Sequence, residues 1–76
     1  MSVVIDGRGL EPPEPFELAM DALLDLSSED SLTVLLDRVP HPLLRILERD
    51  GYPHRCRTDE AGTVTLLIAP PGGRLP

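Results

Sequence analysis

The sequence is poor in aromatic residues, in positive charge and in cysteine. Its 76 residues include no tryptophan and no lysine, and phenylalanine, tyrosine and cysteine occur once each. A single cysteine cannot form an internal disulfide, so nothing indicates a secreted, cross-linked scaffold. Because aromatics are scarce, leucine, valine and isoleucine must build the core. The hydrophobic share of 41% is enough for the core of one small domain.

The charge balance and the lack of long apolar runs exclude further classes of function. Seven arginines, scattered along the chain, face 13 acidic residues, which gives a net charge of −6. Such a surface repels phosphate backbones, so we expect no nucleic-acid binding. The apolar runs fall far short of the ~20 residues that span a bilayer, and the N-terminus does not read as a signal peptide. We therefore expect no membrane association and a cytoplasmic location.

Hydrophobic periodicity predicts four strands and two helices. Short runs that are rich in β-branched residues, or apolar on both faces of a strand, predict strands at residues 3–6, 31–37, 52–58 and 63–69. A second helix is expected to begin near Pro40 and Pro42 and to end before Gly51. The first helix is predicted over 16–26, where the spacing i, i+3, i+4, i+7, i+8 describes one apolar stripe. The stripe consists of Phe16, Ala19, Met20, Leu23, Leu24 and Leu26.

The element order βαβαββ predicts an α/β (α+β) two-layer sandwich. A right-handed crossover makes the first two strands parallel, and the final hairpin adds an antiparallel pair, giving a four-stranded mixed sheet with both helices on one face. We assign residues 1–69 to one domain and expect 70–76 to form a disordered C-terminal tail.

The other face of that sheet is expected to be open and partly apolar. By strand alternation it presents two arginines of the third strand, Arg55 and Arg57, beside a set of apolar and threonine side chains. That set is Val4, Thr33, Leu35, Thr65 and Leu67. Open patches of this kind often contact a partner, so a homodimer through this face is one interpretation and a plain monomer surface is the other.

The string DGRGLEPPEPF, residues 6–16, forms a stiff and charged elbow before the first helix. Gly7 and Gly9 permit backbone angles that other residues avoid, and the prolines stiffen the approach to the helix. Asp6 and Arg8 bracket the turn and can pair with each other or bond its free backbone groups. A rigid loop at a helix N-terminus is a good place for a site. The alternative is an ordinary strand-to-helix connection with no ligand.

This elbow resembles the signature of the TusA/SirA-like sulfur-carrier superfamily, which reads roughly D-x-R-G-x-x-C-P-x-P at the start of the first helix. Five positions match in register: Asp6, Arg8, Gly9, Pro13 and Pro15. The resemblance covers most of the chain, because the family fold is a βαβαββ two-layer sandwich. With the later string DRVPHPL, it indicates a bacterial branch known mainly as a domain of unknown function.

The chain departs from that signature at one position. In the sulfur carriers, the cysteine before Pro-x-Pro takes up a persulfide and passes the sulfur on. Here the position is Pro12, which has no thiol. The resemblance therefore implies a sulfur-carrier scaffold that has lost its sulfur-bearing atom, and a persulfide relay through this loop is excluded.

A second loop is expected to lie beside the elbow. Asp37 and Arg38 follow the second strand, and His41 stands at the start of the second helix. The ends of neighbouring parallel strands meet at one edge of a sheet, so these residues and the elbow would share a rim. The alternative is a surface salt-bridge cluster. The candidate binding residues are Asp6, Arg8, Gly9, Glu11, Pro12, Pro13, Asp37, Arg38 and His41.

His54 and Cys56 form a separate candidate pair. They stand two apart on a predicted strand, hence on one face, and imidazole with thiolate suits a nucleophile or, with His41, a metal site. No metal motif is complete, so we assign no metal and no cofactor. The alternative is that Cys56 is a core residue, since buried free cysteine behaves as a small hydrophobe.

We therefore interpret the chain as a non-catalytic binding or adaptor module. It would recognise a partner protein or a small ligand, and the resemblance implies a link to sulfur or redox metabolism. The hypothesis from a different class is a thiol or sulfur carrier that uses Cys56, with His54 beside it, in place of the missing cysteine.

Overall fold

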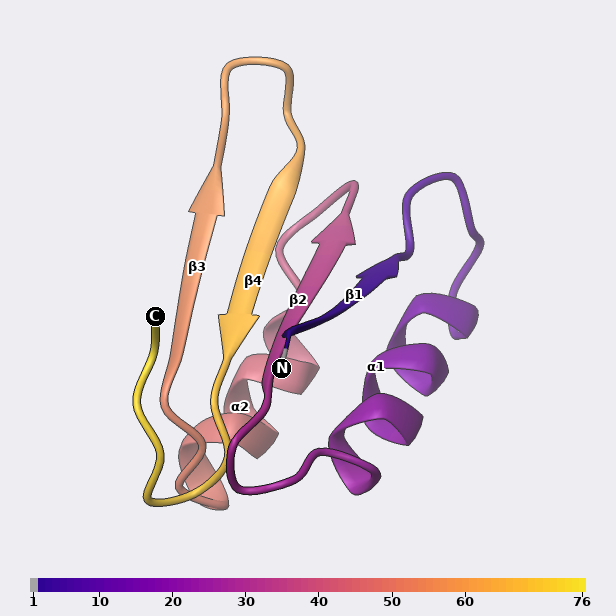
Figure 1. Cartoon of the computed structure of the whole chain (residues 1–76). Coiled ribbons are helices and arrows are strands. Elements are labelled where there is room, and N and C mark those ends of the chain that lie inside the picture. The colour runs from indigo at the N-terminus through magenta and orange to yellow at the C-terminus, as the bar shows by residue number, and fades with distance from the viewer. Residues whose placement is uncertain (1) are drawn as a thin grey trace.

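The computed structural model describes residues 2–76 and contains the six predicted elements in the predicted order (Figure 1). Four are strands and two are helices: β1 (Ser2–Asp6), α1 (Glu14–Leu24), β2 (Ser31–Leu36), α2 (His41–Arg49), β3 (His54–Thr58) and β4 (Val64–Ile68). The βαβαββ prediction is confirmed, and the fold is an α+β sandwich of one sheet and two helices.

The four strands form one mixed sheet in the order β1-β2-β4-β3. β1 and β2 are parallel, with Ile5 opposite Val34, whereas β4 runs antiparallel to both β2 and β3. A βαβ unit therefore makes the parallel pair, and the last two strands form a hairpin. The parallel pairing decides where a site can form, because β1 and β2 end at the same edge of the sheet.

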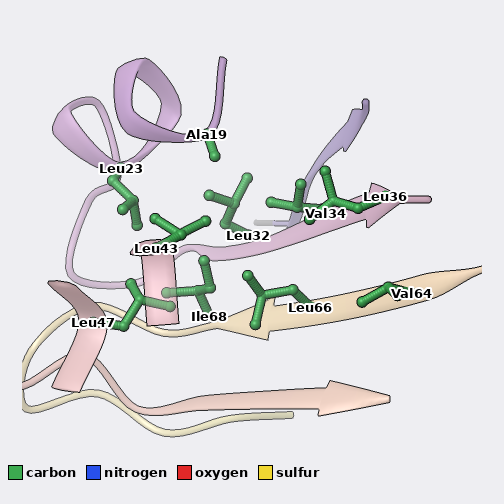
Figure 2. Packing of buried hydrophobic residues seen from close by; sticks show 10 residues of the cluster. All are labelled: Ala19, Leu23, Leu32, Val34, Leu36, Leu43, Leu47, Val64, Leu66 and Ile68. Carbon is green, nitrogen blue, oxygen red and sulfur yellow. The ribbon is translucent and has the colours of Figure 1, made fainter. Parts of the chain in front are cut away.

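The core lies between the sheet and the helices, and aliphatic side chains build it as the composition predicts. Alternate residues of β2 and β4 are buried on the side that faces both helices. Figure 2 shows these side chains meeting residues from α1 and α2 in one continuous cluster. The cluster comprises Ala19, Leu23, Leu32, Val34, Leu36, Leu43, Leu47, Val64, Leu66 and Ile68.

The first helix differs from its predicted span and from its predicted stripe. It begins and ends two residues earlier than expected, because Pro15 is tolerated in the first turn. Its buried face centres on Ala19 and Leu23. Leu24 is 79% exposed and Phe16 is 36% exposed, so the prediction that Leu24 belongs to the core stripe is wrong. The reason is geometric, since Leu24 is turned about 100° away from Leu23 around the helix axis.

The strand register places the predicted residues on the open face of the sheet. Thr33 pairs with Leu67 and Leu35 with Thr65 on that face, and Val4 is 62% exposed. Arg55 and Arg57 project from the edge strand β3 beside Leu67 and Thr65. A shallow hollow of about 490 Å³ lies between these arginines and the two β4 residues. The homodimer through this face stays a prediction.

The last residues run back along the sheet. Ala69 and Pro70 are buried, and the Ala69 N–H donates to the Pro53 carbonyl at 2.9 Å. A turn follows in which the Gly73 N–H donates to the Pro70 carbonyl at 2.8 Å, and the chain then lies beside β3 (Figures 1 and 2). The predicted boundary after residue 69 and the disorder of the tail stay predictions. Within residues 2–76, neither helix has the length and apolarity needed to cross a bilayer.

Candidate functional site

An apolar pocket of about 290 Å³ lies where the loop after β1 meets the loop after β2. We call it the proline-walled pocket. Its two sides come from the two loops and from the first turns of α1 and α2. Almost all of its lining is apolar, and five of its residues are prolines. The lining residues are Gly7, Leu10, Pro12, Pro13, Pro15, Phe16, Leu36, Asp37, Arg38, Val39, Pro40, Pro42 and Leu43.

Both helices begin with the same short sequence pattern at the point where they line the pocket. Each begins with Pro-x-Pro followed by an apolar residue, at residues 13–16 and 40–43. Pro13 and Pro40 occupy the N-cap positions, and neither helix has a side-chain cap. A second proline in the first turn costs no hydrogen bond, because that N–H has no partner in a helix. The repeated pattern therefore places rigid rings on both sides of the pocket, and sequence analysis did not single it out.

Asp6 and Arg8 shape the turn that follows β1. The Arg8 guanidinium donates to both carboxylate oxygens of Asp6, at 2.9 and 2.8 Å, and the Arg8 backbone N–H donates to Oδ1 at 3.1 Å. The side-chain hydrogen bonds from Arg8, followed by its backbone N–H, lower the pKa of Asp6 from 3.8 to about 2. Neither residue lines the pocket. Their pairing therefore fixes the shape of the loop, as the sequence analysis expects.

A carboxylate of the second loop holds the first loop in place. The Gly9 N–H donates to Asp37 Oδ2 at 2.6 Å, and Gly9 has a φ of +77°, which favours glycine. The Gly7 N–H donates to the Leu35 carbonyl at 2.7 Å, and a Cβ on Gly7 would lie 3.0 Å from Leu36 Cδ2. The two loops are thus joined by hydrogen bonds and close contact, so the pocket is formed before any ligand arrives.

The predicted binding residues divide into three groups in the structure. Pro12, Pro13, Asp37 and Arg38 line the pocket. Asp6, Arg8, Gly9 and Glu11 support the first loop, the last through its carbonyl, which accepts from the Glu14 N–H at 3.0 Å. His41 begins α2, is exposed and does not line the pocket. That these residues bind a ligand stays a prediction.

Most of the apolar lining is absent from the residues predicted from the sequence. Nothing in the spacing of Leu10, Phe16, Val39 and Leu43 indicates that they share a cavity. The available signal was the repeated Pro-x-Pro-apolar pattern after two parallel strands, since neighbouring strands bring such repeats to one edge.

Cys56 and His54 lie away from the pocket, on β3. Cys56 pairs with Leu66, is half-buried and packs against the core, and burial raises the pKa of its thiol. The His54 ring Nδ1 lies 2.8 Å from the Tyr52 carbonyl oxygen. Over the described part of the chain, no three His, Cys, Asp or Glu residues are grouped so that they could hold a metal ion. A joint metal site of His41, His54 and Cys56 is therefore not formed.

Comparison with known proteins covers both pocket loops. The family model described as "Uncharacterized conserved protein (DUF2249)" matches residues 4–70. The crystal structure of a SirA-like protein from Desulfitobacterium hafniense is similar, with a TM-score of 0.78 and 27% sequence identity. That likeness covers 97% of this chain and 100% of the other. Among curated proteins, none matches the chain.

Proposed function

The chain belongs to the DUF2249 family of uncharacterised conserved proteins, and from that premise we propose that it is a non-catalytic binding or adaptor module that recognises a partner through the proline-walled pocket. One observation supports this most directly. The loop that resembles the sulfur-carrier signature walls an apolar pocket, and the residue at the cysteine position, Pro12, is part of that wall.

The chemistry of the lining favours binding over reaction. Its only side chains with charge or polar atoms are those of Asp37 and Arg38, and Asp37 already accepts the Gly9 N–H. No hydroxyl, thiol or imidazole is among the lining residues, so the described pocket offers no nucleophile and no proton shuttle of neutral pKa. Apolar walls with one or two polar groups are typical of sites that hold an apolar group in a fixed orientation.

The metabolic and cellular context of this module is also part of the proposal. A link to sulfur or redox metabolism rests on the likeness to sulfur carriers and to the SirA-like protein. A cytoplasmic location rests on the single cysteine, which leaves no internal disulfide to suggest a secreted scaffold. The thiol carrier on Cys56 remains the alternative, and the burial and raised pKa of that thiol argue against it, because the thiolate is the reactive form.

Titration with a small apolar probe tests the proposal. N-acetyl-phenylalanine amide, added to ¹⁵N-labelled protein, should shift the amide signals of Leu10, Phe16 and Val39 and saturate at about 1–10 mM, as expected for a fragment-sized ligand. Leu10→Asp places a charge in the wall and should abolish the shifts. Val4→Asp is the matched control, because Val4 is 62% exposed on the opposite face of the sheet. Shifts outside the pocket, or none, would refute the proposal.

A further inference from the structure

An exposed apolar row extends along α1 from the proline-walled pocket. Phe16, Met20 and Leu24 stand four residues apart and therefore lie on one side of the helix. Phe16 lines the pocket and is 36% exposed, Met20 is half-buried, and Leu24 is 79% exposed. The row spans about 12 Å at 1.5 Å per residue. It thus offers a partner a second apolar contact beyond the pocket itself.

An acidic row runs directly beside the apolar one. Glu17, Asp21 and Asp25 follow the apolar residues by one position each, so they form the next ridge around the helix. All three side chains are exposed. Among residues 2–76, none of these carboxylates is in an ion pair with an arginine. A partner that lies along α1 would therefore have to cover or approach three unpaired negative charges.

The chain segment that carries this surface has charges of one sign between Arg8 and Arg38, and Arg38 itself lies in the pocket wall. No arginine occurs between Arg8 and Arg38, and Arg8 is already paired with Asp6. The same stretch contains eight acidic residues: Glu11, Glu14, Glu17, Asp21, Asp25, Glu29, Asp30 and Asp37. Burying the carboxylates of Glu17, Asp21 and Asp25 under a neutral or acidic surface is unfavourable, whereas opposite charges across an interface select the partner and speed its arrival.

We infer that the partner of the proline-walled pocket is a basic, amphipathic segment of another protein. This inference rests on the proposed function and names the chemistry of what that pocket recognises. One apolar side chain of the segment enters the pocket beside Phe16. A second, placed one helical turn or two further on, covers Met20 and Leu24. Lysine or arginine side chains of the segment face Glu17 and Asp21.

A pair of synthetic peptides tests this chemistry on the full chain. The first is a fluorescein-labelled peptide of about 14 residues with leucine at helical spacing and lysine between. The second is identical except that glutamate replaces lysine. By fluorescence anisotropy the basic peptide should bind, and the acidic one should bind at least about tenfold more weakly. Raising the ionic strength to about 1 M, where the Debye length is about 3 Å, should weaken the basic complex.

Two double variants show which carboxylates contribute to binding of the basic peptide. The double variant Glu17→Gln with Asp21→Asn should bind the basic peptide with about five- to tenfold lower affinity, since each substitution removes one exposed ion pair. Glu48→Gln with Glu60→Gln makes the same change in net charge at exposed positions outside α1 and should change the affinity by less than about twofold. Leu24→Ser should weaken binding without affecting the fold, because Leu24 is 79% exposed. Equal losses in the two double variants would overturn the inference.

The outcomes separate this inference from the proposed function. If the basic peptide fails to bind, or the acidic peptide binds as well, while N-acetyl-phenylalanine amide still shifts the pocket signals, the partner chemistry is wrong and the pocket function stands. If the capped amino acid also fails, the proposed function falls. Binding of the basic peptide that survives Leu10→Asn, which makes the wall polar without adding a charge, would show that α1 attracts it without the pocket, and would overturn the inference as well.

Discussion

At the scale of single residues, Pro12 and Cys56 carry the account, because one stands in the pocket wall and the other is half-buried elsewhere. Pro12 is exposed in the wall of the pocket, whereas Cys56 packs against the core opposite Leu66. The two positions differ in access to solvent and in the environment of a thiol. A thiol at position 12 is therefore expected to react quickly, and the thiol of Cys56 slowly.

Pro12→Cys in a Cys56→Ala background should present a thiol that a chromogenic disulfide reagent modifies within the mixing time of a manual assay. Wild-type protein, with Cys56 alone, should react much more slowly under native conditions and fully after denaturation, because burial raises the pKa of that thiol. Ser28→Cys in the same background provides an exposed-loop reference. Native Cys56 reacting as fast as this reference would revive the thiol-carrier alternative.

The Asp6–Arg8 pair predicts a specific dependence on pH. The pKa of Asp6 is about 2 in the folded protein and about 3.9 in an unfolded chain, so the stability it contributes is present above pH ~4 and is lost as the pH falls through about 2. A ¹³C NMR titration of the Asp6 carboxyl should give this low midpoint. In Arg8→Gln the midpoint should rise toward the ordinary value. An unchanged midpoint in the variant would show that Arg8 is not the cause.

At the scale of elements, the parallel pair β1 and β2 positions two similar loops, and Asp37 joins them. The carboxylate of Asp37 accepts the Gly9 N–H at 2.6 Å. This contact links residues that are 28 apart in the chain, so it fixes one wall of the pocket against the other. The site is therefore a property of the two βα units together.

Asp37→Ala should release the first loop. The Gly9 amide should exchange with solvent faster, and the free energy of unfolding should fall by about 1 kcal/mol, the usual contribution of one hydrogen bond. Native hydrogen exchange by NMR and urea denaturation measure the two effects. Glu48→Gln, at an exposed position of α2, is the control and should change neither. An unaltered exchange rate at Gly9 would mean that the loop holds its shape without Asp37.

Particular residues explain why the elements were predictable and the pocket was not. Strands that are apolar on both faces and the glycine expected after the second helix, Gly51, are local signals that fix strand and helix order; the structure gives Gly51 a φ of +78°. The prediction for Leu24 is wrong because spacing alone defines an apolar stripe but does not determine which side of that stripe packs against the sheet. The pocket joins Leu10 and Phe16 to Val39 and Leu43, and such a contact between distant loops depends on strand pairing that local pattern does not specify.

At the scale of the whole molecule, a 76-residue chain has little stability to lose. A domain of this size buries only ~60% of the surface that its unfolded chain exposes, so its stability is marginal. The fold depends on one layer of aliphatic side chains between the sheet and two helices. The pocket at the edge of the sheet has no second core layer behind it. Its loops keep their positions because hydrogen bonds join them and prolines stiffen them.

Leu66→Ala should therefore destabilise the protein severely. Leu66 is fully buried at the centre of β4, and removing its side chain costs about 2–5 kcal/mol, a large part of the stability of so small a domain. Val4→Ala, on the open face at 62% exposure, should cost less than about 0.5 kcal/mol. Thermal unfolding followed by circular dichroism compares the two. Similar losses in both variants would show that the core does not lie where the structure places it.

The central claim is that the proline-walled pocket is a binding site rather than a chemical centre. Intermolecular nuclear Overhauser effects between the ring protons of N-acetyl-phenylalanine amide and the protein test it most directly. The account predicts cross-peaks to the side chains of Phe16, Val39 and Leu43, and their loss in Leu10→Asp. Cross-peaks to the open face of the sheet, at Thr33 or Leu67, with none to the pocket would contradict it.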